Sequence, residues 1–109
     1  MVTTDIFRQM ALSFPGAIEL PHFDRASFRV NDRIFATLDE KKKIAVLMLS
    51  PIEQSVFCAF DKSIIYPVHG SWGRNGATIF ELGKIKKAML KDALTVVYNE
   101  IIVKAAKKK

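Results

Sequence analysis

The sequence predicts one α+β domain, in which an antiparallel β-sheet is flanked by an N-terminal and a C-terminal helix. Apolar residues recur at helical spacing near both ends of the chain. Between them, short runs with strand character alternate with turn residues such as Asn31-Asp32. At 109 residues, the chain has room for one hydrophobic core but not for two. The order of helix, strands and helix therefore favours the α+β class.

The first helix is expected from Thr3 or Thr4 to about Ser13. Either threonine can cap its N-terminus, and the Phe-Pro-Gly sequence at 14–16 ends it. Its apolar stripe consists of Ile6, Phe7, Met10, Ala11 and Phe14. This spacing predicts a helix that lays one face on the core.

Several short segments have strand character. They are 17–20, 26–30, 33–38, 44–49, 64–68 and 77–82. Asn31-Asp32 predicts a two-residue hairpin, and 39–43 predicts a longer turn. The segment IAVLML at 44–49 is apolar throughout. It is either a central strand covered on both faces or part of a helix, and its periodicity alone does not separate the two.

A second helix is expected to begin at Ser50 and to run to about Phe60. The serine can cap the helix, Pro51 suits its first position, and Glu53 can close a capping box. Cys58, the only cysteine, lies in this helix among apolar residues, where a buried and inert thiol is expected. A single cysteine excludes an internal disulfide and a cysteine-based zinc site within one chain.

The last helix is expected from about residue 84 to residue 104, after Gly83 interrupts the apolar pattern. Its apolar positions recur at three and four residues and are Ile85, Ala88, Met89, Ala93, Val96, Val97 and Ile101. Residues 1–104 would form the domain, and 105–109 a disordered lysine-rich tail.

Net charge is +6, but the lysines of the C-terminal tail supply much of it. Without Lys104, Lys107, Lys108 and Lys109, 13 basic residues stand against 11 acidic ones, a net of +2. The remaining lysines cluster at 41–43 and at 84–91. The first cluster is either a solvated hairpin tip or a set of phosphate contacts. The second falls in the first turns of the last helix, where the macrodipole disfavours cations; this indicates an anionic partner unless the lysines serve solubility alone.

The segment YPVHGSWGRNGAT at 66–78 is the strongest candidate for a site. Its glycines recur every third residue, at 70, 73 and 76, and hold Trp72 and Arg74 at a bend. In the structural alternative, Trp72 covers the edge of the core and Arg74 pairs with a carboxylate.

Catalytic and metal-binding patterns are largely missing, so no enzymatic activity, metal or cofactor is expected. His22 and His69, with Asp24 or Asp61, would make a two-histidine one-carboxylate site only if the fold brought them together. His69 could act as a general acid or base with Arg74 binding an anion, but a hydrogen-bonded loop residue is the simpler interpretation of each histidine. The sequence shows no apolar run of bilayer length and no signal-peptide pattern, which favours a cytoplasmic protein without a membrane partner.

Three motifs in order resemble the MmcQ/YjbR family of small bacterial proteins. They are ALSFPGAIELPHF at 11–23, SFRVNDRIFATL at 27–38 and YPVHGSWGRNGAT at 66–78, followed by the closing amphipathic helix. The resemblance covers nearly the whole chain. It implies a CyaY/frataxin-like fold and a role in binding double-stranded DNA, with β-hairpin wings holding the duplex. Iron delivery is not expected, because the first helix carries only Asp5 where frataxins have an acidic ridge.

Two functions follow from these observations. In the first, a non-enzymatic DNA-binding protein uses basic hairpins for phosphates, while Trp72 and Arg74 stack on a base and grip a phosphate. The residues expected to contact nucleic acid are Arg29, Arg33, Lys41, Lys42, Lys43, Trp72, Arg74, Lys84, Lys86 and Lys87. In the second, His22, His69, Trp72 and Arg74 form a pocket for a small anionic ligand or a protein partner.

Overall fold

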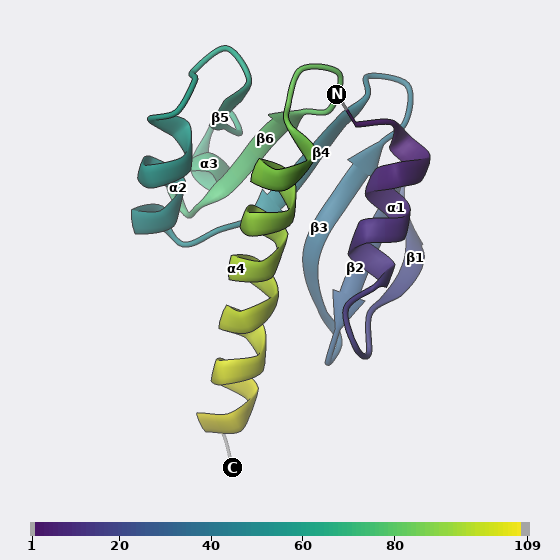
Figure 1. Cartoon of the computed structure of the whole chain (residues 1–109). Helices are drawn as coiled ribbons and strands as arrows, with labels where there is room; N and C mark the ends of the chain where they lie inside the picture. The colour runs from purple at the N-terminus through teal and green to yellow at the C-terminus, as the bar shows by residue number, and fades with distance from the viewer. Residues whose placement is uncertain (1, 108–109) are drawn as a thin grey trace.

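The computed structural model describes residues 2–107 and shows an antiparallel sheet flanked by helices (Figure 1). In chain order the elements are α1 (Thr4–Leu12), β1 (Ile18–His22), β2 (Arg25–Val30), β3 (Arg33–Asp39), β4 (Ile44–Met48), α2 (Pro51–Cys58), β5 (Ile65–Pro67), α3 (Ser71–Arg74), β6 (Ala77–Glu81) and α4 (Lys87–Lys107). The six strands are arranged in the order β1-β2-β3-β4-β6-β5. The α+β class with terminal helices is confirmed.

Two of the three expected helix starts are confirmed by their hydrogen bonds. Thr3 caps α1, because its Oγ1 accepts from Ile6 N at 3.0 Å. At α2, Ser50 Oγ accepts from Glu53 N at 3.2 Å and donates to Glu53 Oε1 at 2.9 Å, which completes the capping box. Cys58 at the end of α2 is half-buried, and that burial raises the pKa of its thiol.

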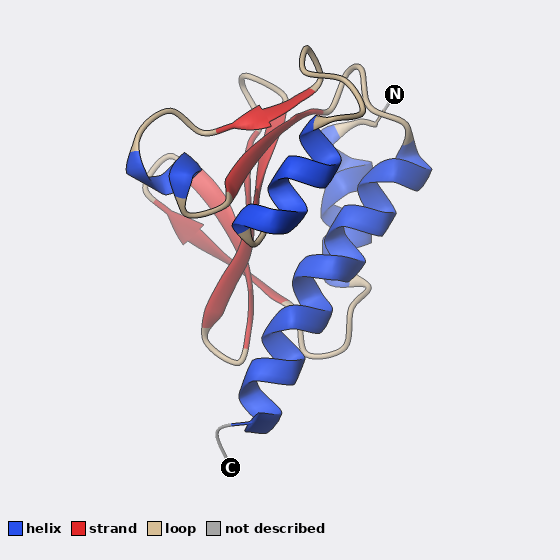
Figure 2. Cartoon of the chain, turned by 90° about the vertical axis from the view of Figure 1, so that its left-hand side faces the viewer, coloured by secondary structure: helices blue, strands red, loops and turns tan. Residues whose placement is uncertain are grey.

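Helices α1, α2 and α4 cover one face of the sheet (Figure 2). The largest fully buried side chains include Phe7 of α1, Phe28 and Phe35 of β2 and β3, Phe80 of β6 and Leu94 of α4. The apolar segment at 44–49 is the strand β4 rather than a helix, and Ala45, Val46 and Leu47 in it are all buried. Its neighbours β3 and β6 place it inside the sheet, as its unbroken apolar character predicts.

The last helix begins at Lys87, three residues later than expected. Glu81 O accepts hydrogen bonds from Lys84 N at 3.1 Å and Ile85 N at 3.0 Å, so a separate turn precedes the helix. The buried face of α4 includes Leu90 and Leu94, which the predicted stripe omitted, whereas the predicted Ala88 is exposed. The helix continues through residue 107, and the rest of the expected tail, 108–109, lies outside the described residues.

The two edge strands each contain a proline. Pro21 lies in β1, which reaches His22 instead of ending at residue 20, and Pro67 ends the three-residue β5. Proline has no backbone N–H to donate to a neighbouring strand. Both edges of the sheet are therefore interrupted.

Candidate nucleic-acid interface

The two lysine clusters of the sequence meet at one end of the sheet. The first lies in the turn between β3 and β4, and the second in the connection between β6 and α4 and at the first residue of α4, Lys87. Leu82 N donates to Lys43 O at 3.1 Å, and Ile44 pairs with Glu81, so the two segments are adjacent. Figure 1 shows both connections side by side at the upper end of the sheet. We call this surface the lysine-rich end; it comprises Lys41, Lys42, Lys43, Lys84, Lys86 and Lys87.

All lysines of this end are exposed. Within residues 2–107, none of them forms an ion pair. The turn that carries Lys42 is closed by Asp39 Oδ1, which accepts from Lys42 N at 3.1 Å. Lys84 lies near Asp61 and contributes to lowering the pKa of that carboxyl, after the hydrogen bonds from Ser63 that lower it most. The positive charges are thus directed to solvent and available to an anion.

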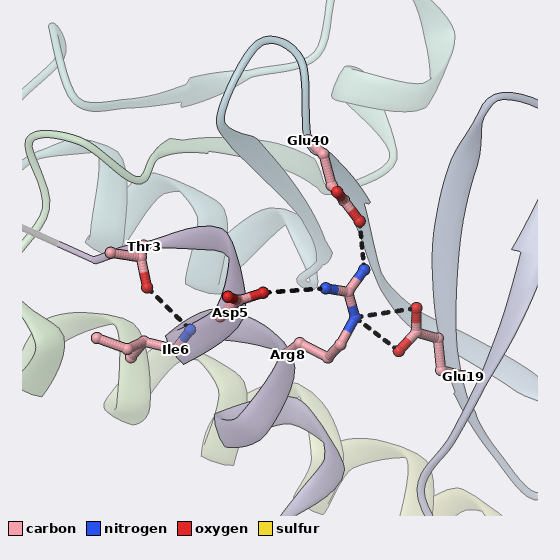
Figure 3. Close-up of polar contacts among 6 residues, drawn as sticks. All are labelled: Thr3, Asp5, Ile6, Arg8, Glu19 and Glu40. Carbon is pink, nitrogen blue, oxygen red and sulfur yellow. Dashed lines mark hydrogen bonds and ion pairs between the residues drawn. The ribbon is translucent and has the colours of Figure 1, made fainter.

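An arginine on α1 anchors the lysine-bearing turn (Figure 3). Arg8 Nε donates to both carboxylate oxygens of Glu19, at 2.9 and 3.1 Å, and Nη2 donates to Glu40. Asp5 lies 3.5 Å from Nη1. The bonds to Glu40 and Glu19 raise the pKa of Arg8, which stays charged. Glu40 directly precedes Lys41, so the bonds from Arg8 to Glu40 and Glu19 hold the lysine-bearing turn against α1 and β1. The charge of Arg8 also offsets the charges of these two carboxylates, which lie beside the lysines.

Phe23 projects from the same end of the sheet and was absent from the predicted residues. It lies between His22 and Arg25, which are the last pair of β1 and β2, and its side chain is 93% exposed. Its φ of 60° is in the left-handed region, which a residue with a large side chain rarely adopts. A groove of about 660 Å³ separates it from the lysine-bearing turn and is lined in part by Arg8, Phe23 and Lys41. The expected strands at 17–20 and 26–30 left five residues between them, so the sequence did not show that Phe23 lies in a two-residue connection; its only signal was an aromatic residue next to Asp24 between two strands.

The remaining predicted contacts lie at the opposite end of the sheet. Val30 pairs with Arg33 beside the Asn31-Asp32 hairpin, whose two residues have φ of 51° and 64°. Arg29 Nε donates to Ser27 Oγ at 3.1 Å, farther along β2. Trp72 and Arg74 are on α3, which lies just before β6 in the chain. The first residue of β6, Ala77, pairs with Met48 at the end of β4, so α3 is at the end of the sheet away from the lysines. The expected hairpin wings therefore point to opposite ends, and the ten predicted residues do not form one surface.

The two histidines do not meet. His22 ends β1 at one edge of the sheet, whereas His69 follows β5 at the other edge. The expected pocket of both histidines with Trp72 and Arg74 is thus wrong in including His22. In the part of the chain that the structure describes, no group of three His, Cys, Asp or Glu residues is placed to hold a metal ion.

The expected glycine-rich loop contains the short helix α3. A Cβ at Gly73 would lie 1.6 Å from Val68 O, and a Cβ at Gly76 would lie 1.8 Å from Leu49 O. Gln54 Nε2 also donates to Gly73 O at 2.7 Å, which links α2 to α3. Two of the three glycines therefore permit close backbone packing.

Trp72 on α3 is 61% exposed and borders a groove of about 240 Å³. The groove is lined by Met48, Leu49, Trp72, Asn75 and Ala77. Arg74 is exposed, and within residues 2–107 it pairs with no carboxylate. In the structural alternative, Trp72 covers the edge of the core and Arg74 pairs with a carboxylate. Trp72 does border core residues Leu49 and Ala77, although it is largely exposed, whereas the Arg74 ion pair is not found among residues 2–107.

Comparison with known proteins supports the fold. No family model matches the sequence, and no curated protein matches it. Among solved structures, the crystal structure of Deinococcus radiodurans protein DR2400, with a DUF419 domain, is similar with a TM-score of 0.74. The two sequences are 20% identical, and the match covers 90% of this chain and 77% of that one. At this identity the likeness establishes a shared fold. Among residues 2–107, no helix has the length and apolar character to cross a membrane.

Proposed function

We propose that this chain is a cytoplasmic, non-enzymatic DNA-binding protein of the MmcQ/YjbR family, and that its lysine-rich end contacts the phosphates. The observation that carries the proposal is the meeting of two sequence-distant lysine clusters at one end of the sheet. The three sequence motifs and the fold shared with a DUF419 domain support the family assignment.

Lysines at such a surface act as point charges that contact phosphates without reading bases. Binding would release condensed counterions, so affinity would fall steeply with salt. If all lysines of this end contact double-stranded DNA, the slope of log K against log salt would approach about −5. The proposal therefore predicts salt-sensitive binding with little sequence preference.

Fluorescence anisotropy of a labelled 20-base-pair duplex, at about 50 and 200 mM salt, tests the proposal. One variant replaces Lys41, Lys42 and Lys43 with Gln, and a second does the same at Lys84, Lys86 and Lys87. A third variant removes equal charge from the opposite end, through Arg33→Gln, Arg74→Gln and Lys104→Gln. The first two should reduce the salt slope by about 3 and weaken binding at least about 10-fold, whereas the third should have a smaller effect.

Equal losses in all three variants would show that net charge alone attracts DNA, against an interface at the lysine-rich end. Absence of duplex binding at 50 mM salt would contradict the DNA-binding function itself.

Trp72 supports a second candidate function, the binding of a small anionic ligand or a protein partner. Its exposed indole borders the groove with Met48 and Leu49, and the exposed Arg74 follows it on α3. Because Trp72 is the only tryptophan, its fluorescence reports on this groove alone. Titration with inorganic phosphate or with cell-extract fractions should shift its emission, and Arg74→Ala should abolish the shift without unfolding the chain. Lys91→Ala is the matched control, and an unresponsive indole would contradict this candidate.

A further inference from the structure

We propose that Phe23 is a stacking platform for an unpaired nucleobase, which makes DNA with unpaired bases the preferred substrate of the lysine-rich end. The inference rests on the proposed DNA-binding function and adds the class of DNA. It begins from a side chain that contributes little to the fold.

Phe23 occupies its position at a conformational cost and with little packing in return. Its φ of 60° brings Cβ close to the neighbouring carbonyl, a conformation that glycine or asparagine adopts more readily. Its side chain is 93% exposed, and among the described residues its ring pairs only with the ring of His22, with centroids 4.9 Å apart. Strained residues that do not serve packing are concentrated at binding sites.

The position of Phe23 relative to the lysines suits a single nucleic-acid strand. In the strand order, the β1–β2 hairpin is followed by the β3–β4 turn with Lys41, and then by the end of β6 before Lys84. The β1–β2 and β3–β4 connections are two strands apart, or about 10 Å, and the end of β6 lies directly beside β4. The aromatic ring and the cations thus form one row along the end of the sheet. A single row of this kind suits one phosphate backbone. The two hairpins that were expected to hold a duplex lie instead at opposite ends of the sheet.

Stacking energetics favour unpaired bases over an intact duplex. A base stacked on an aromatic side chain contributes roughly 5- to 100-fold in affinity and needs no particular sequence. Inserting the ring between paired bases would first disrupt stacking within the duplex, which offsets most of this gain. An unpaired base presents its face without that cost.

The carboxylates around Phe23 limit the kinds of partner into which its ring could insert. Glu19 and Glu40 are bound by Arg8, and Arg25 lies 3.9 Å from Asp39. Asp24 is exposed next to Phe23, so a phosphate would bind on the lysine side of the ring. Insertion of the ring into a lipid surface would carry the Asp24 carboxylate with it, which disfavours a membrane as the partner.

The test compares the anisotropy of labelled dT20 and of a labelled 20-base-pair duplex at one salt concentration. The wild-type chain should bind dT20 at least about 5-fold more tightly than the duplex. Phe23→Gly should lose roughly 5- to 100-fold affinity for dT20, keep its duplex affinity, and melt at the same or a higher temperature, because glycine tolerates this φ. Phe23→Tyr keeps a ring and should bind like the wild type. Asn31→Gly also introduces glycine at a left-handed position, at the tip of the opposite hairpin, and should leave both affinities unchanged.

The outcomes separate this inference from the function on which it rests. If Phe23→Gly binds dT20 like the wild type while the lysine variants lose duplex affinity, the stacking role is overturned and the DNA-binding function stands. If the wild-type chain binds neither DNA, the proposed function fails, and the inference with it. Tighter binding to phosphatidylserine vesicles than to dT20, lost in Phe23→Gly, would assign the ring to a membrane and overturn the inference.

Discussion

At the scale of single residues, the bond between Tyr66 and Glu81 links the edge strand β5 to β6. The Tyr66 hydroxyl donates to Glu81 Oε2, and this bond, together with partial burial, raises the pKa of the tyrosine. The folded state therefore holds the phenolic proton more tightly than the unfolded chain does. The resulting stabilisation is complete below the ordinary tyrosine pKa of about 10 and is lost as pH rises through the folded value.

Tyr66→Phe should lower the free energy of unfolding by about 1 kcal/mol at neutral pH, because one charge-assisted hydrogen bond disappears. The gap between wild type and variant should shrink above about pH 10, because the phenol of the unfolded wild-type chain ionises there while the folded state still holds its proton. Urea unfolding of both chains between pH 7 and 11 measures this difference in the free energy of unfolding. A gap that stays constant to pH 11 would show that the bond does not control the titration.

Arg8 gives a second prediction at this scale, since its contacts with Glu19 involve two side chains only 27% and 28% exposed. Arg8→Met should lower the free energy of unfolding by about 1–2 kcal/mol, because Glu19 and Glu40 lose their shared cation. The double variant with Glu19→Gln should recover part of the loss. A double-mutant cycle by urea unfolding measures the coupling, and additive effects would mean that the ion pair contributes nothing beyond its separate residues.

At the scale of elements, sequence reasoning succeeded where the determinants are local. Thr3, Ser50 and Glu53 cap helices through neighbours three residues away, and Asn31-Asp32 forms the expected two-residue hairpin, with both residues in the left-handed region. It failed at α3, because the close approach of Gly73 to the backbone of Val68, and of Gly76 to that of Leu49, decides the conformation of this segment, and the spacing of the glycines does not show these contacts. The register shift between β2 and β3 was equally hidden, since it depends on pairing.

Packing of α3 yields a prediction about its glycines. Gly73→Ala should lower the free energy of unfolding by more than about 2 kcal/mol, because the new methyl group would overlap the carbonyl of Val68. Gly70→Ala is the matched control: its φ of 90° strains alanine, but no atom lies within 4 Å of the new Cβ. Gly70→Ala should lower the free energy of unfolding by only about 1 kcal/mol. Thermal or urea unfolding ranks the two, and similar losses would contradict steric packing as the reason for Gly73.

At the scale of the whole molecule, the sequence predicted the charges but not their arrangement. The separate lysine clusters were visible, yet their meeting depends on antiparallel pairing of β4 with β6. The same pairing places Arg74 at the opposite end of the sheet, and the pairing of β3 with β2 and β4 does so for Arg33. The strand order keeps His22 from His69. The sequence pattern predicted hairpins between consecutive strands, but it does not show which non-consecutive strands pair, such as β4 and β6.

Helix α4 extends the molecule away from the lysine-rich end, as Figure 1 shows. A chain truncated after Val103 should therefore retain salt-sensitive duplex binding, with a loss smaller than that of the Lys41–Lys43 variant. Anisotropy at two salt concentrations measures both chains side by side. Loss of binding on truncation alone would move the interface to the C-terminal lysines.

The prolines of the edge strands have a consequence for the proposed DNA binding, in which many copies would share one DNA. A polyanion concentrates its ligands, and adjacent sheets with open edges would tend to join into a continuous ribbon. Pro21 and Pro67 each remove a backbone donor from the strand where such growth would begin. Crowding along a nucleic acid should thus produce a row of independent particles, whose dissociation does not depend on their neighbours.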